Sequence, residues 1–315
     1  MRVLVTGGAG FIGSHLCEAL LKNDEVTEVI CMDNLACANE SNIKHLKKNS
    51  KFRFINQDIV NMNNANESNI ECDYIMHFAS RPSPIDYVRD PVPTMLVGSF
   101  GTYNMLELAR KNKCEIMFAS TSEVYGDPLE HPQKETYWGN VNCIGPRACY
   151  DESKRFSEAL MFSYHRQYNV KIKIIRIFNT YGPRMRKDDG RIVPAFISQA
   201  LKNQDLTIFG DGKQTRSFCY VSDLVSGIIK FMELKQDYTG PINLGNPDEY
   251  TVVEFAEIIK KLTKSNSTLV FRDLPKDDPA RRRPDITLAK KVLKWKPEIS
   301  LEQGLKNTIE WFKEN

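Results

Sequence analysis

The feature that most constrains the fold is a glycine-rich loop directly after the first apolar run. Residues 2–6 read as a buried strand, and residues 7–13, Gly-Gly-Ala-Gly-Phe-Ile-Gly, place glycines at positions 7, 10 and 13. Residues 12–22 then carry apolar side chains at helical spacing. Glycines at a strand-to-helix junction let the backbone turn tightly and approach a pyrophosphate at the helix N-terminus. The loop therefore predicts a dinucleotide site at the start of an α/β fold.

An acidic residue strengthens this prediction. Asp33 closes the next expected strand, 20 residues after Gly13, where a carboxylate accepts hydrogen bonds from an adenosine ribose. Asp33 also repels a 2′-phosphate, and residues 34–36 include no arginine to hold one, so NAD is favoured over NADP. The alternative is an ordinary turn beside an unrelated aspartate, but three glycines are an expensive way to build one. Asp58 is a further candidate, for adenine, although an exposed loop aspartate explains it nearly as well.

The pattern of the whole chain predicts two parts. Up to about residue 180, short β-branched runs alternate with amphipathic segments, which indicates a doubly wound parallel Rossmann sheet covered by helices. We expect strands at 2–6, 28–33, 52–56, 74–79, 115–120 and 171–177, and helices at 12–22, 94–113 and 150–168. In the second part we expect helices at 192–202, 222–234, 251–262 and 301–313, and the Asn-rich stretch 61–69 is expected to be a surface loop. The predicted division is an NAD-binding domain, 1–180, and a smaller C-terminal α/β substrate-binding lid, 181–315, with chain crossings between them.

Composition narrows the class of partner. The net charge is only +3, from 43 basic and 40 acidic residues, so bulk charge favours neither nucleic acid nor a membrane surface. The sequence contains no 18-residue apolar run, and a strand at residue 2 leaves no room for a signal peptide. The eight cysteines form no CxxC pair and have no histidine partner at zinc spacing. We therefore expect a cytoplasmic protein with reduced thiols and no metal site.

A tyrosine and a lysine form the candidate catalytic pair. Tyr150 and Lys154 are spaced i, i+4 and share one face of an expected helix. A nearby ammonium favours tyrosinate, so we expect Lys154 to lower the pKa of Tyr150 toward neutrality and make it a base for a sugar hydroxyl. Thr121, at the end of a strand, is placed to reach the same pocket. The alternative is a tyrosine and a lysine on a solvated helix face.

Several motifs together carry a family resemblance. The chain resembles the extended nucleotide-sugar epimerases and dehydratases of the short-chain dehydrogenase/reductase superfamily over nearly its whole length, through the glycine loop, Thr-Ser-Glu-Val-Tyr-Gly at 121–126, Tyr150-x-x-x-Lys154 and Arg-Ile-Phe-Asn-Thr-Tyr-Gly-Pro-Arg at 176–184. Residues 121–154, with His-Pro-Gln at 131–133, Tyr-Trp-Gly at 137–139 and Ile-Gly-Pro-Arg-Ala-Cys-Tyr-Asp-Glu at 144–152, are similar to UDP-glucuronate decarboxylases, which make UDP-xylose. So is Asp-Pro-Ala-Arg-Arg-Arg-Pro-Asp-Ile at 278–286.

The narrower resemblance implies an NAD-dependent decarboxylation through a transient 4-keto sugar. Dehydratases of the superfamily carry an Asp-Glu pair after the threonine, whereas this chain has Ser122-Glu123, so the acid for a leaving hydroxyl is missing. A 4-keto hexuronate is a β-keto acid that loses carbon dioxide once it is positioned, given a donor for the enolate and a proton at C5. The resemblance implies Thr121, Glu123, Tyr150 and Arg282 as the acting groups, with Lys154 supporting Tyr150 and the nicotinamide ribose. Glu123 as a buried structural carboxylate paired with a cation is the alternative.

The resemblance also implies residues for both ligands. The cofactor residues are Gly7, Gly10, Phe11, Ile12, Gly13, Asp33, Asn34, Asp58, Ile59, Ala79 and Ser80, with Tyr150 and Lys154. A UDP-uronate carries three negative groups, so fixed cations are expected. The substrate residues are Ser83, Tyr87, Asn179 for a phosphate oxygen, Arg191 for the nucleotide side, Arg216 for the pyrophosphate and Arg282 for the carboxylate. Solvated surface arginines are the alternative for any one of them, and Arg81 and Leu96 depart from the family, which often has a proline and a substrate-contacting lysine there.

By family analogy, helices at 94–113 and 150–168 form a four-helix seam in a homodimer, and Met161 and Phe162 serve either that seam or the core. Two other functions remain open. One is a C4 epimerase or 4,6-dehydratase of the same fold, and the other is a non-catalytic NAD-binding regulator. The intact Thr121, Tyr150 and Lys154 argue against a regulator, because a sensor need not keep a proton relay.

Overall fold

A seven-stranded parallel sheet forms the centre of the protein, in a computed structural model that describes residues 1–62, 69–274 and 281–315. Its strands, in spatial order, are β11 (Ile242–Leu244), β6 (Ile172–Ile177), β5 (Glu115–Thr121), β4 (Tyr74–His77), β1 (Arg2–Thr6), β2 (Glu28–Asp33) and β3 (Phe52–Asn56). The chain builds outward from β1 to β3 on one side and then returns to place β4 on the other. The order therefore reverses beside β1, and open α/β sheets bind ligands at such a point. The predicted doubly wound parallel sheet is confirmed.

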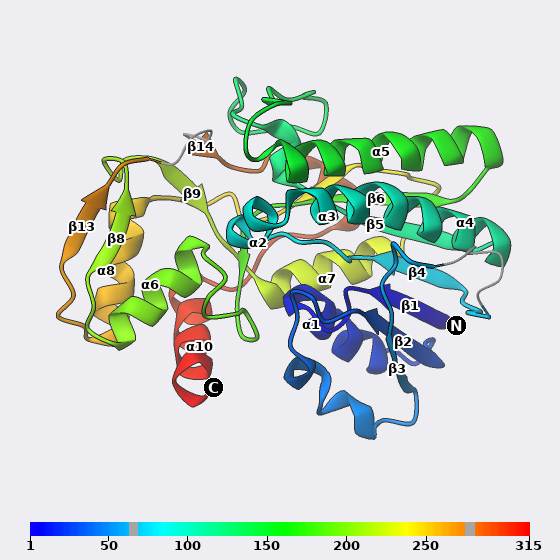
Figure 1. Ribbon diagram of the computed structural model, residues 1–315, viewed down its shortest axis with the longest axis horizontal. Coiled ribbons are helices and arrows are strands. Elements are labelled where there is room, and N and C mark those ends of the chain that lie inside the picture. The colour runs from blue at the N-terminus through cyan, green and yellow to red at the C-terminus, as the bar shows by residue number, and fades with distance from the viewer. Residues whose placement is uncertain (63–68, 275–280) are drawn as a thin grey trace.

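Helices cover both faces of this sheet (Figure 1). On one face lie α4 (Thr102–Asn112) and α5 (Ala148–Tyr168), and on the other lie α1 (Phe11–Leu21) and α7 (Val221–Met232). Alternate residues of one strand feed the two cores, as the two-residue period of a strand requires. Val3 and Val5 pack in the core that includes α1 and α7, whereas Leu4 packs in the core that includes α4 and α5.

The segment expected to be one helix at 94–113 is divided in three. It consists of α3 (Pro91–Leu96), a π-helical turn η3 (Val97–Gly101) and α4. Small residues in the turn allow close packing, since a Cβ at Gly98 would lie 2.6 Å from Cβ of Ser153 on α5. Periodicity locates the helical segment but cannot reveal the extra residue in its middle, because one widened turn alters the spacing only locally.

The second half of the chain has a core of its own, which includes Phe196, Phe218 and Phe255. Its helices are α6 (Ile192–Leu201), α8 (Val252–Thr263) and α10 (Leu301–Glu314), beside the strand pairs β8 (Leu206–Phe209) with β13 (Leu269–Arg272), and β9 (Thr215–Ser217) with β12 (Glu249–Thr251) and β14 (Arg281–Arg282). However, α7 and β11 leave this half and join the central sheet. The chain therefore crosses between the two parts, and their division at residue 180 stays a prediction.

The remaining short elements are η1 (Glu40–Ile43), η2 (Leu46–Lys48), α2 (Pro84–Arg89), η4 (Ser122–Tyr125), β7 (Thr180–Tyr181), β10 (Cys219–Tyr220) and α9 (Thr287–Leu293). Most of the predicted Asn-rich loop at 61–69 lies outside the described residues. Among the described helices, none combines the length and apolar character needed to cross a bilayer.

Candidate active site

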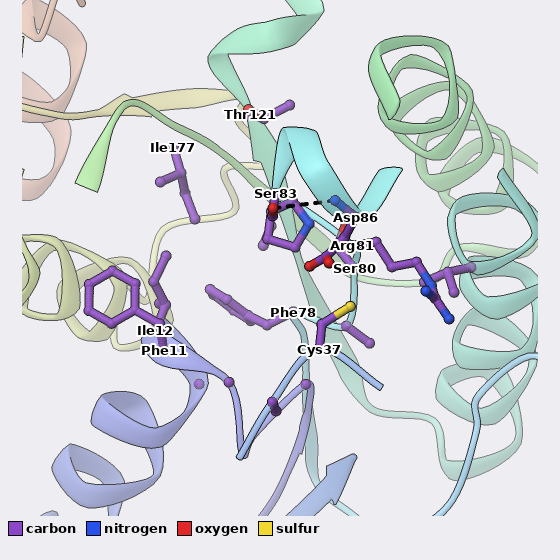
Figure 2. Close-up of a pocket in the computed structure, with 18 of the residues that line it drawn as sticks. Phe11, Ile12, Cys37, Phe78, Ser80, Arg81, Ser83, Asp86, Thr121 and Ile177 are labelled. Carbon is purple, nitrogen blue, oxygen red and sulfur yellow. Dashed lines mark hydrogen bonds between the residues drawn. The ribbon is translucent and has the colours of Figure 1, made fainter. Parts of the chain in front are cut away.

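A pocket opens where β1, β2, β4, β5 and β6 end, at the point where the strand order reverses. Figure 2 shows it between Phe11 and Ile12 on one side and Arg81 and Ser83 on the other, with Thr121 beyond them. Every residue of the predicted cofactor set lines this pocket, namely Gly7, Gly10, Phe11, Ile12, Gly13, Asp33, Asn34, Asp58, Ile59, Ala79, Ser80, Tyr150 and Lys154. Thr121, Glu123, Ser83, Asn179 and Arg191 line it as well. One cavity thus brings the predicted cofactor residues together with all the predicted catalytic residues except Arg282.

The glycine loop leaves no space for side chains at two of its positions. A Cβ at Gly13 would lie 2.1 Å from the carbonyl oxygen of Gly7, and a Cβ at Gly7, where φ is +69°, would lie 2.8 Å from Cα of Ala79. The bare backbone therefore brings the N-terminus of α1 directly to the pocket. This arrangement fits the pyrophosphate of a dinucleotide.

Asp33 holds the same loop in place. Its Oδ2 accepts a hydrogen bond from the amide of Ala9 at 3.0 Å, and its Oδ1 accepts one from the amide of Leu35 at 2.8 Å. Burial raises the pKa of this carboxyl above its ordinary value. The side chain of Asn34 donates to Oδ2 of Asp58 at 2.9 Å, so these two predicted cofactor residues are linked. The carboxylate set beside the loop fits the ribose and adenine of NAD.

Tyr150 lies in the first turn of α5, beside Thr121 at the end of β5, and the hydroxyl of Thr121 favours the ionised phenol. Its ring stacks on the ring of Tyr87, with the centroids 5.3 Å apart and the planes 8° from parallel. Burial raises the pKa of Tyr150 above its ordinary value, and the negative charge of Glu123 adds to this. The prediction that the pKa of Tyr150 is lowered toward neutrality is therefore wrong, because the surrounding residues raise it.

The environment of Lys154 shows why this lysine does not lower the pKa of Tyr150 as expected. Its Nζ donates a hydrogen bond to the carbonyl oxygen of Ala119 at 2.7 Å and lies 5.9 Å from the centre of the Tyr150 ring. Burial lowers the pKa of Lys154 to about 7, because an ammonium loses hydration inside the protein. Helical spacing predicted that the two residues share a face, which they do, but it did not include the effect of burial on both.

Glu123 is held by two arginines. Its Oε2 accepts hydrogen bonds from Nη2 of Arg147 at 2.7 Å and from Nη2 of Arg282 at 2.9 Å, and its Oε1 accepts a second one from Arg282. Burial alone would raise the pKa of Glu123, but the charges of Arg282 and Arg147 lower it to about 2. Glu123 is therefore a carboxylate at neutral pH.

Arg282 is buried, does not itself line the pocket, and is paired with Glu123. Gln133 fixes the segment that carries it, because its amide donates to the carbonyl of Arg283 and its Oε1 accepts from the amide of Arg283, both at 2.9 Å. The predicted partner of the substrate carboxylate is thus already bound to a carboxylate of the protein. Residues 278–280 of the arginine motif lie outside the described residues.

The other predicted substrate residues are more dispersed. Ser83 donates to the carbonyl of Asp189 at 2.6 Å, and Arg191 pairs with the carboxylate of the same residue. Tyr87 lies behind Tyr150 and does not line the pocket, and Arg216, on β9, lies outside it too. Of the two departures from the family, Arg81 lines the pocket and pairs with Asp90 at 3.0 Å, whereas Leu96 does not line it.

Sequence reasoning did not select several residues of the site. Arg147 is the most important, and its only sequence signal was its place three residues before Tyr150 in the quoted motif. Arg147 itself does not line the pocket, but Cys37, Asp86, Arg184, Arg186 and Asp189, which were not selected either, do. Arg186 pairs with the buried Asp86 at 2.9 Å, which ties the loop after β7 to α2. Such pairs depend on tertiary contacts that no local pattern reports.

Comparison with known proteins agrees with this geometry. The chain matches the model of the family described as GDP-mannose 4,6 dehydratase over residues 4–308. UDP-glucuronic acid decarboxylase 6 of Arabidopsis thaliana is 52% identical over 305 residues, which cover 97% of this chain and 87% of that protein. UDP-glucuronic acid decarboxylase 1 of Danio rerio is 48% identical over 311 residues, which cover 99% of this chain and 72% of that protein.

Solved structures of the same fold are similar throughout. The UDP-glucuronic acid 4-epimerase of Bacillus cereus, in complex with UDP-glucuronic acid and NAD, has a TM-score of 0.91 and 32% identity, and the match covers 100% of this chain and 99% of that one. A dTDP-glucose 4,6-dehydratase of Streptomyces venezuelae with NAD bound has a TM-score of 0.91 and 28% identity, and the match covers 100% and 98%.

Proposed function

Because this chain belongs to the UDP-glucuronic acid decarboxylases, we propose that its pocket removes the carboxylate of UDP-glucuronate as carbon dioxide and forms UDP-xylose through a transient 4-keto sugar. The chain is an NAD-dependent enzyme with the Rossmann fold. The proposal concerns the product, the intermediate and the roles of individual residues.

One observation carries the choice between decarboxylation and dehydration. Removal of a C6 hydroxyl needs an acid that gives it a proton, but the residue after Thr121 is a serine and the next residue, Glu123, is kept ionised by two guanidiniums. A carboxylate with a pKa of about 2 holds no proton to give at neutral pH. Loss of carbon dioxide from a β-keto acid needs no such acid, so this site suits a uronate.

In the proposed reaction, NAD, when bound, takes a hydride from C4 of the sugar and later returns it. Tyr150 accepts the proton of the C4 hydroxyl as a tyrosinate, after its own proton has been released to solvent, and Thr121 lies beside the phenol. When protonated, Lys154 is the nearby positive charge that favours release of the phenolic proton.

Once C4 is a ketone, the bond between C5 and C6 breaks and its electron pair becomes an enolate on the C4 oxygen. Tyr150 then carries a proton again, and its raised pKa makes it a stable hydrogen-bond donor to that oxygen. Arg282 orients the departing carboxylate. A proton from water is added at C5, and Tyr150 returns its proton to the C4 oxygen when C4 is reduced again. Asn179 and Arg191 hold the nucleotide side of the substrate, whereas contact with Arg216 requires the substrate to extend beyond the residues that line the pocket.

The test is a pair of product assays on the purified protein with NAD. We expect carbon dioxide from carboxyl-labelled UDP-glucuronate and UDP-xylose as the sugar product, together with no 4-keto-6-deoxy sugar from UDP-glucose. Dehydration of UDP-glucose without release of carbon dioxide from the uronate would replace the decarboxylase by a dehydratase. Recovery of the C4 epimer of UDP-glucuronate, with its carboxylate intact, would favour an epimerase.

We also propose that the protein is a cytoplasmic homodimer. The helices expected to form the seam carry exposed apolar side chains, with Val92 64% exposed, Phe100 59%, Phe156 49% and Tyr103 46%. Exposed apolar side chains of this kind support a subunit interface on these helices. Met161 is buried in the core and Phe162 packs against it, so neither is needed for the seam. The eight free cysteines support a reducing compartment.

A further inference from the structure

Two arginines and two carboxyl groups meet beside the Thr121–Tyr150 pair. We call Glu123, Arg147, Asp151 and Arg282 the ionic cluster. Glu123 accepts hydrogen bonds from both arginines, and the side chains of Arg282, Glu123 and Arg147 are only 5%, 15% and 16% exposed. Charges this far from water require partners. The balance of positive and negative charge within the cluster therefore matters for what the cluster can bind.

The cluster contains more positive than negative charge. Burial, followed by the charge of Glu123, raises the pKa of Asp151 to about 7, so a large fraction of this carboxyl is neutral at neutral pH. In that state the four members of the cluster are two guanidiniums, one carboxylate and one neutral carboxyl. Tyr87, Tyr150 and Glu152 are the other titratable groups that act on it; the two tyrosines hold their protons because burial raises their pKa, and Glu152 pairs with Arg155. Within these four residues, positive charge therefore exceeds negative charge.

The hydrogen bonds of the cluster are also incomplete. Among the described residues, few buried side-chain polar atoms lack a partner, and three of them are Nε of Arg282, Oδ1 of Asp151 and the hydroxyl of Tyr87, which lies against Arg147. Buried polar atoms are almost always paired, so such a concentration needs an explanation. Nε of Arg282 and the hydroxyl of Tyr87 are both donors, and donors without acceptors indicate an anionic ligand.

The two arginines are held in different ways. Arg147 is the residue that precedes α5, and its guanidinium lies 5.9 Å from the centre of the Tyr87 ring, which in turn stacks on Tyr150. Arg282 lies on β14, a strand of two residues beside the backbone that Gln133 fixes, and gives two hydrogen bonds to Glu123, whereas Arg147 gives one. If a substrate carboxylate draws Arg282 away, Arg147 is the cation that stays with Glu123.

We propose that Arg147 is a positioning residue that keeps Glu123 paired while Arg282 turns to the carboxylate of the substrate, so that the site selects a uronate with a pair of arginines. This inference rests on the proposed function and adds to it a residue that sets specificity without touching the sugar. Without Arg147, two carboxylates would compete for Arg282, and the anionic substrate would lose more affinity than a neutral one.

The test compares Arg147→Gln, which removes the charge, with Arg147→Lys, which keeps the charge but not the fork of donors. Arg166→Gln is the matched control, because Arg166 is an exposed arginine on the same helix. For each protein, dissociation constants are measured for UDP-glucuronate, UDP-glucose and UDP, and kcat and KM are measured against pH.

For Arg147→Gln we expect binding of UDP-glucuronate to weaken about tenfold or more, while binding of UDP and UDP-glucose changes less than about twofold. The acid limb of kcat/KM should move to higher pH, because one of the two guanidiniums that lower the pKa of Glu123 is gone. Arg147→Lys should return the acid limb toward the wild type and recover only part of the affinity. Arg166→Gln should match the wild type throughout.

Equal losses for all three ligands in Arg147→Gln would show a merely structural residue and overturn the proposal, as would unchanged binding of UDP-glucuronate with an unmoved acid limb. A misfolded Arg147→Gln leaves Arg147→Lys to decide, since wild-type affinity and pH profile there would contradict a need for the paired fork. If the wild type releases no carbon dioxide, the proposed function fails. The binding comparison still judges the role of Arg147 in that case.

Discussion

Burial disfavours the charged form of each catalytic side chain, and whether a partner compensates decides what each side chain can do. It raises the pKa of the phenol of Tyr150, lowers the pKa of the ammonium of Lys154 to about 7, and is outweighed at Glu123 by two guanidiniums. The neutral forms of the first two groups are therefore favoured, whereas the charged form of Glu123 is favoured. The hydroxyl of Tyr150 and the carboxylate of Glu123 are the groups whose removal gives the clearest results.

Tyr150→Phe removes the proton acceptor beside Thr121 but keeps the ring that stacks on Tyr87. We expect NAD affinity to stay within about twofold and kcat to fall by about 10²–10⁴, the usual contribution of general acid–base catalysis. Cofactor titration and single-turnover reduction of NAD measure the two effects. Tyr168→Phe, at the exposed end of the same helix, is the control. Near wild-type turnover in Tyr150→Phe would mean that the tyrosine is structural.

Glu123→Gln leaves two buried guanidiniums without their carboxylate, and we expect the protein to lose about 3–5 kcal/mol of stability at neutral pH. The ordinary pKa of 4.5 is lowered to about 2 in the fold, so this ion cluster stabilises the wild type above about pH 4.5 and the contribution disappears as the pH falls toward 2. Urea denaturation at several pH values should show wild type and variant converging in acid. A constant difference down to pH 2 would contradict the ionised Glu123. Release of carbon dioxide should slow in the variant while C4 oxidation survives.

At the scale of elements, the glycine loop, the start of α1 and the end of β2 act as one unit. The amide of Ala9 in the loop donates to the carboxylate of Asp33 at the end of β2, so the loop that approaches the pyrophosphate and the group that approaches the ribose are directly bonded. A change at one of them therefore affects the other.

From this unit we expect NAD to bind at least tenfold tighter than NADP, which equals about 1.4 kcal/mol, because a buried carboxylate faces the position of a 2′-phosphate. Calorimetric or fluorescence titration of both dinucleotides measures it. Asp33→Asn should reduce the ratio of the affinities for NAD and NADP. It should also weaken the binding of NAD, since Oδ1 and Oδ2 both accept amide hydrogen bonds of the loop and strand end. Equal affinities of the wild type for the two dinucleotides would exclude this role of Asp33.

Elements also show how far the sequence could predict the structure. Short runs rich in β-branched and aromatic residues predicted β1, β2 and β3 to the residue, although Arg53 and Asn56 of β3 remain exposed. The strand β11 has only three residues, Ile242–Leu244, too few for any period to be seen. In the same way, local motifs predicted a set of residues that together line the pocket, but they did not predict Arg147 as a partner of Glu123. That pair joins residues 24 positions apart in the chain and exists only after folding.

At the scale of the whole molecule, the apolar face around η3 predicts the assembly. We expect a dimer of the wild type at micromolar concentration by light scattering, and a monomer for Phe100→Asp, because a charge placed in the centre of an interface costs its full desolvation. Phe271→Asp, a substitution of an equally exposed phenylalanine on β13, should leave the dimer intact. A monomeric wild type with full activity would contradict a dimer formed through these helices. Dissociation of both variants into monomers would mean that the interface does not lie specifically on the face around η3.

The return of α7 and β11 to the central sheet limits how such proteins can be recombined. Ile228 and Phe231 of α7 share a core with Val3 and Val5 of β1, and β11 completes the outer edge of the sheet against β6. In a chimera joined at residue 180, most of the central sheet therefore comes from one parent. The helix α7 and the edge strand β11 come from the other parent and are shaped to fit that parent's sheet. Exchange of substrate preference between relatives has to keep these two elements with the parent that supplies the glycine loop, and the usable crossover points lie on either side of them.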